Sequence, residues 1–138
     1  MDFINRIAPF SWIEHENGGA AVVLYIDENY KAELFKTRKD EGFEGSGYDW
    51  ESLAEVYIQE HFPDLQSEVE FDSEYMMFCA YSFELDAFRC FAIGFKEACE
   101  NDELIADLFS RTAPQKPITV DDIQNILNDI MNIKKNDN

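Results

Sequence analysis

The chain has 138 residues, of which 29 are acidic and 11 are basic, so its formal net charge at pH 7 is −18. This charge argues against nucleic acids and anionic membrane surfaces as partners, because both would repel it. Since 46 % of the residues are hydrophobic and 14 % aromatic, the chain can bury a core, which a disordered acidic tail cannot do.

The first predicted element is a β-hairpin. Residues 10–15 and 20–26 are rich in β-prone side chains, and the sequence Asn17-Gly18-Gly19 between them is a turn signal. The run 20–26 is apolar on both of its faces, which predicts a central strand covered on both sides. Residues 27–39 fit either a short helix or a third strand.

A glycine-rich loop at 42–47 separates this hairpin from the next predicted helix. Asp49 is predicted to be the N-cap of that helix, which ends near His61 because Pro63 follows. Residues 69–72 and 75–81 then predict a second strand pair, and the strand 75–81 is again apolar on both faces.

Two further helices are predicted at 85–100 and 102–110, where apolar residues recur at helical spacing. Pro114 and Pro117 mark a linker at 112–118. After it, Thr119 and Asp122 resemble a capping box at the start of an amphipathic helix.

We therefore expect an α+β fold. One mainly antiparallel sheet, made of two β-hairpins, would be packed by two or three helices within residues 1–111. The Pro-containing linker 112–118 would lead to a C-terminal amphipathic helix with a polar tail at 119–138. This helix must dock its apolar stripe on its own domain or on a second subunit.

The cysteines and the N-terminus favour a cytoplasmic protein. The three cysteines include no C-x-x-C pair and are expected to be free thiols, as is usual in the reducing cytosol. The first six residues lack the apolar core of a signal peptide, and the apolar run 20–26 is too short to span a bilayer.

No motif of catalysis, metal binding or cofactor binding stands out. His15 and His61 do not have metal-ligand spacing, and no cysteine pattern joins them. The glycine loop lacks the Gly-Lys-Ser/Thr of a phosphate-binding loop, and its acids would repel phosphate. We expect a protein that is not an enzyme and needs no cofactor or metal.

The distribution of the acids indicates a binding function. Residues 40–88 contain fourteen Asp or Glu residues and no Lys or Arg. Like charges in one fold repel and destabilise it, which suggests that the stretch is kept for a function. The most direct such function is the attraction of a basic partner. The simpler alternative is that the acids only keep the protein soluble.

Several segments also resemble a known family. These are 40–54 (DEGFEGSGYDWESLA), 71–74 (FDSE), 77–81 (MFCAY) and 95–99 (FKEAC). Together they resemble the immunity proteins of bacterial polymorphic toxin systems, and among these the family called immunity protein 51. The resemblance runs from about residue 10 to residue 111 and implies a small cytosolic protein that binds and neutralises a cognate toxin domain.

The glycine loop and the start of the following helix are the predicted partner-binding site. Aromatic side chains would anchor the partner and acids would supply the charge. Phe43 is expected to be exposed, because a loop without apolar neighbours has little use for a Phe, although it could also fasten the loop to the sheet. Trp50 could equally be a core residue, and Asp49 a helix cap. The predicted site residues are Glu41, Phe43, Glu44, Tyr48, Asp49, Trp50 and Glu51.

Two other functions fit the sequence. The chain could be a small acidic domain that binds a metal or a cationic small ligand. It could also be a structural module that forms a homodimer through its C-terminal helix.

Overall fold

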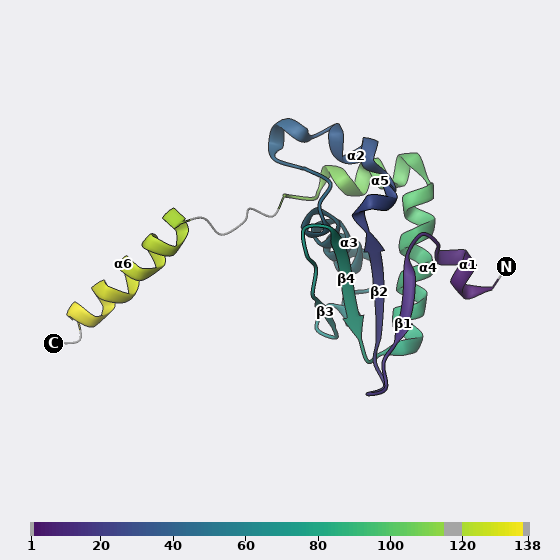
Figure 1. The fold of residues 1–138 in the computed structure, drawn as a ribbon, viewed down its shortest axis with the longest axis horizontal. Coiled ribbons are helices and arrows are strands. Elements are labelled where there is room, and N and C mark those ends of the chain that lie inside the picture. The colour runs from purple at the N-terminus through teal and green to yellow at the C-terminus, as the bar shows by residue number, and fades with distance from the viewer. Residues whose placement is uncertain (1, 115–119, 137–138) are drawn as a thin grey trace.

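A four-stranded antiparallel sheet forms the centre of the protein (Figure 1). The computed structural model describes residues 2–114 and 120–136. The strands are β1 (Ser11–Glu14), β2 (Ala20–Tyr25), β3 (Val69–Phe71) and β4 (Met77–Ser82), in the order β1-β2-β4-β3. Both predicted strand pairs are present, and β2 pairs with β4 to join them. The α+β fold is therefore confirmed.

Helices account for most of the remaining chain. They are α1 (Phe3–Ile7), α2 (Ala32–Lys36), α3 (Gly47–His61), α4 (Leu85–Glu100), α5 (Asp102–Ser110) and α6 (Val120–Asn136), with 3-10 turns η1 (Ile26–Glu28), η2 (Lys39–Glu41) and η3 (Pro63–Leu65). The bounds of α4 and α5 agree with their predictions. Residues 27–39 form turns and a short helix rather than a third strand. The short helix α1 was not predicted.

The core lies between the helices and one face of the sheet. Trp50 on α3 is 1 % exposed and sits at its centre. Its ring lies 5.2–6.0 Å, between centroids, from those of Phe10, Tyr30, Phe35 and Phe95. Aromatic pairs of this kind contribute about 0.5–1.5 kcal/mol each beyond the area they bury. The alternative in which Trp50 is a core residue is therefore the observed one.

Strand β2 is central, as predicted, but its two faces differ. Val22 and Leu24 belong to the main core, whereas Ala21 and Val23 point the other way and lie outside the core cluster. Both are nonetheless only 4 % exposed. Helices α3 and α4 lie on one side of the sheet (Figure 1), and no helix of the described residues covers the other side, so a second layer over β2 is not observed.

Helix α3 begins earlier than predicted, because Ser46 rather than Asp49 is its N-cap. The Ser46 hydroxyl accepts a hydrogen bond from the Asp49 amide at 3.2 Å, and the Asp49 carboxylate accepts one from the Ser46 amide at 3.3 Å. This reciprocal pair is a capping box, in which an acid at the third helical position supports the cap. Asp49, predicted to be the N-cap, is therefore the third helical residue, which supports the N-cap Ser46.

The C-terminal helix α6 is present and lies apart from the sheet and the other helices (Figure 1). Residues 115–118 of the predicted linker, and Thr119 of the predicted capping box, lie outside the described residues. Thr112, the first residue of the predicted linker, is 2 % exposed and packs on the body of the protein.

Replacing Gly47 by Ala should destabilise the protein strongly. A Cβ atom at Gly47 would overlap the backbone oxygens of Glu74 and Met77, which side-chain rotation cannot relieve. We expect a loss of about 3 kcal/mol in the free energy of unfolding, as for a severe overpacking change. The matched control is Gly18→Ala, where no heavy atom lies within 4 Å but φ is +92°. Urea denaturation should show a smaller loss there, of about 1 kcal/mol for the positive φ alone. Equal losses would contradict the close approach at Gly47.

The three cysteines should differ in reactivity. Cys99 on α4 is fully buried, and burial raises the pKa of its thiol to about 12. At about pH 8 the reactive thiolate of Cys99 is therefore almost absent in the folded state. Iodoacetamide followed by peptide mass spectrometry should find Cys90, which is exposed, modified first and Cys99 unmodified. All three should react in denaturant, and rapid labelling of native Cys99 would contradict its burial.

Candidate partner-binding surface

The buried carboxylate of Asp49 holds the glycine loop in place. One of its oxygens accepts hydrogen bonds from the amides of Glu44 at 2.7 Å, Gly45 at 2.8 Å and Ser46 at 3.3 Å. The loop can wrap around this oxygen because Gly42 and Gly45 take φ values of +107° and +76°, which favour glycine. Asp49 is only 3 % exposed, so its charge is satisfied mainly by backbone N–H groups.

Arg38 fastens the other end of the loop. Its guanidinium carbon lies 4.7 Å from the ring centroid of Phe43 and 4.8 Å from that of Phe109. It donates to both carboxylate oxygens of Glu41 at 2.7 Å, and to the carbonyl oxygens of Phe109 and Thr112. The loop is thereby joined to the end of α5.

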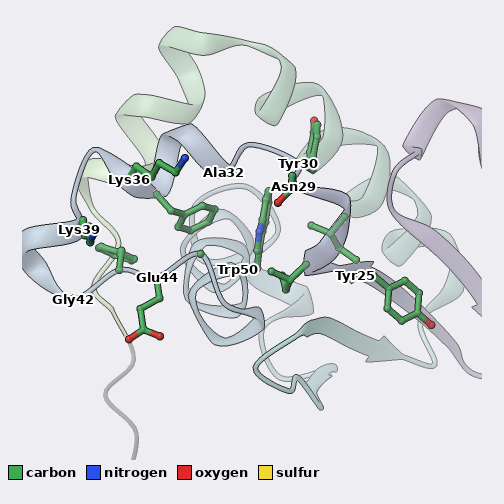
Figure 2. A pocket seen from close by; sticks show the side chains of 14 residues that line it. Tyr25, Asn29, Tyr30, Ala32, Lys36, Lys39, Gly42, Glu44 and Trp50 are labelled. Atoms are coloured by element: carbon green, nitrogen blue, oxygen red, sulfur yellow. The ribbon is translucent and has the colours of Figure 1, made fainter.

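A groove of about 540 Å³ lies between the glycine loop and the segment from η1 to η2 (Figure 2). The floor is apolar and includes Leu24, Phe35 and Trp50. The rim is polar and carries charges of both signs, since Lys36 and Lys39 lie on one wall and Glu44 on the other. An apolar side chain with a charged neighbour is the kind of group that such a groove could accept.

Exposed aromatic side chains lie beside the glycine loop and at the edge of the groove. Tyr75 is 52 % exposed and its hydroxyl donates to the Glu44 carboxylate at 2.7 Å, which raises the pKa of Tyr75. The turn that carries it is held to the start of α3, because the Gly47 amide donates to the Tyr75 carbonyl oxygen at 2.8 Å. Tyr48, Met76 and Tyr25 are also 40–52 % exposed. Aromatic residues and Met are enriched in protein–protein interfaces.

The predicted site residues divide into exposed and buried groups. Glu41, Glu44 and Tyr48 are exposed, and Glu51 is half-buried. The expectation that Phe43 is exposed is wrong, because it is 2 % exposed and packs its ring 4.7 Å from that of Phe109. Trp50 is buried in the core and Asp49 beneath the loop. These three buried residues shape the surface from below, while a role of the exposed ones in binding stays a prediction.

Sequence reasoning missed Tyr75 and Met76, which extend this surface, and Tyr25, which lines the groove. A signal was available for two of them. Tyr75 and Met76 form part of the tight connection between β3 and β4, where large apolar side chains have no core to enter. We define the loop–turn surface by four exposed residues. Glu44 and Tyr48 come from the glycine loop and the start of α3, and Tyr75 and Met76 come from the β3–β4 connection.

Among residues 2–114 and 120–136, no group of three or more His, Cys, Asp or Glu side chains is arranged to hold a metal ion. In the same ranges, no helix combines the length and apolar character needed to cross a membrane.

Comparison with known proteins identifies a family. A protein-family model described as immunity protein 51 matches residues 10–114. This range includes the sheet, helices α2 to α5, the glycine loop and the loop–turn surface, and it leaves α6 outside. No curated protein and no solved structure matches the chain.

Replacing Asp49 by Asn should loosen the loop without changing its size. An amide oxygen is a weaker acceptor than a carboxylate, and an NH₂ group turned toward the backbone would face other donors. We expect the free energy of unfolding to fall by about 2 kcal/mol, as for hydrogen bonds to a buried charged group. The control is Glu55→Gln, an exposed acid of the same helix, which should stay within about 0.5 kcal/mol. Similar values for the two variants in urea denaturation would show that Asp49 does not anchor the loop.

Proposed function

Because the chain belongs to the immunity protein 51 family, we propose that it binds a cognate bacterial toxin domain and neutralises it in the cytoplasm. The family match over residues 10–114 carries this proposal. The proposed action is blockage by binding, without catalysis by this chain.

We place the contact at the loop–turn surface. Exposed Tyr48, Tyr75 and Met76 can act as anchors, and Glu44 lies among them with its charge at the surface. The partner is expected to be basic, because the chain carries −18 and its residues 40–88 contain no Lys or Arg. A complementary charge steers association and raises its rate at low salt.

The groove next to this surface would accept one side chain of the toxin. Its apolar floor offers a pocket to an apolar or aromatic anchor, and Glu44 on the rim is positioned for a basic neighbour of that anchor. Glu41 contributes less, since its carboxylate already forms an ion pair with Arg38 at 2.7 Å. Of the predicted loop residues, the proposed contact therefore keeps Glu44 and Tyr48. It adds Tyr75 and Met76 of the β3–β4 connection.

A homodimer through α6 is a separate proposal. The apolar residues of this helix between Ile123 and Met131 are 46–60 % exposed, which favours a contact that the single chain does not provide.

Two substitutions in the loop–turn surface should separate charge from anchoring. Glu44→Lys should lower the association rate severalfold at low salt, with a smaller effect at high salt where charges are screened. Tyr75→Ala should instead speed dissociation, and we expect at least a tenfold weaker affinity if Tyr75 is an anchor. Surface plasmon resonance with a toxin domain captured from the native host would measure the association and dissociation rates.

The matched control is Glu16→Lys, which makes the same charge change in the β1–β2 turn, at the other end of β2 from the groove. It should affect the association rate less than Glu44→Lys does. If the host toxin does not bind at all, the proposed function fails. If it binds and the loop–turn variants behave like the control, only the placement of the contact fails.

A further inference from the structure

The sheet has a face that no helix of the described residues covers. Side chains alternate along a strand, so the pairing register defines this face. Ile13 of β1 pairs with Ala21, and Val23 and Tyr25 of β2 pair with Cys79 and Met77 of β4. The neighbours Val22 and Leu24, by contrast, point into the core. We call the residues on the outer side the open sheet face; its main apolar members are Ile13, Val23, Tyr25, Met77, Cys79 and Tyr81.

This face is nearly free of charge. The nine positions that the register places on it include one charged residue, Glu70, which pairs with Tyr81. Across the whole chain 29 % of the residues are charged. The face is partly open to solvent, since Ile13 is 42 % and Tyr25 49 % exposed, whereas Ala21 and Val23 at its centre are only 4 % exposed. A large apolar area with few charges is typical of a surface that binds another protein.

Helix α6 has the same character. Its apolar stripe comprises Ile123, Ile126, Leu127, Ile130 and Met131, each 46–60 % exposed. From 123 to 131 the sequence contains one charged residue, Asp129, and its other polar residues are Gln or Asn. Figure 1 shows this helix apart from its own sheet. Within residues 2–114 and 120–136, the chain therefore presents two apolar surfaces that no other element covers, one on a helix and one on a sheet.

The net charge favours contact between these two surfaces in different copies. Two copies of a chain with charge −18 repel each other, and the repulsion is least where the surfaces that meet carry few charges. The open sheet face and residues 123–131 of α6 are such surfaces. A basic partner gains little from a face with one acid and is drawn instead to the acidic regions.

We propose that α6 of one copy packs across the open sheet face of a second copy, and that the exchange is reciprocal. Reciprocal contact gives a closed two-fold dimer. It also makes each helix–sheet contact twice, which brings the buried area toward the roughly 1,200–2,000 Å² of a stable interface. This proposal does not depend on toxin binding, because the loop–turn surface takes no part in it.

The test is the mass of the full chain in solution, measured by sedimentation equilibrium over a range of concentrations. The expected mass is twice 16.1 kDa. Higher salt should strengthen the dimer, because it screens the repulsion between like-charged copies. Ile126→Asp on α6 and Ile13→Glu on the sheet should each weaken the dimer at least tenfold. Both side chains are 42–54 % exposed, so neither change removes a core residue.

The control is Leu104→Glu, which adds the same charge at a 56 % exposed apolar residue of α5 and should leave the dimer intact. Circular dichroism should show that each variant is folded. If the Ile13→Glu variant is not folded, Ile13→Thr replaces it in the test, because Thr keeps a β-branched side chain. A wild-type mass of 16.1 kDa at all concentrations would overturn the proposal. A dimer that survives the folded sheet variant, or one that Leu104→Glu abolishes, would overturn it as well.

Discussion

The arrangement around the glycine loop depends on one buried carboxylate. The charge of Asp49 is met by the amides of the loop that it organises. Burying a charge is tolerable only when such partners are present. The loop must therefore follow a path that brings its N–H groups to this oxygen. That path sends Phe43 into the core and leaves Glu44 on the rim of the groove.

The elements with strong periodicity could be predicted from the sequence, and the placement of loop side chains could not. Helices α4 and α5 follow their apolar stripes, and both strand pairs follow their turns. Phe43 was misjudged because the rings that bury it, Phe35 and Phe109, come from α2 and α5. Contacts between such distant segments leave no local pattern. The same holds for Asp49, whose role in the loop depends on the fold of residues before it.

The fold separates its charge from its apolar area. Most acids of the long one-sign stretch lie on loops, turns and outer helix faces, whereas Asp49 is buried and Glu70 lies on β3. The open sheet face and residues 123–131 of α6 each carry one charged residue. An acidic protein of this size thus keeps two kinds of surface, and each suits a different kind of partner.

Arg38 connects the glycine loop to the segment that follows α5. Its guanidinium stacks against Phe43 of the loop, and it donates to the carbonyl oxygens of Phe109 and Thr112, just before the chain continues toward α6. A pull on α6 would reach the folded body at Thr112 and pass through Arg38 into the glycine loop. Because Thr112 also bonds to Leu108 and Phe109, α5 and the wall of the groove would share a mechanical load from the C-terminal end.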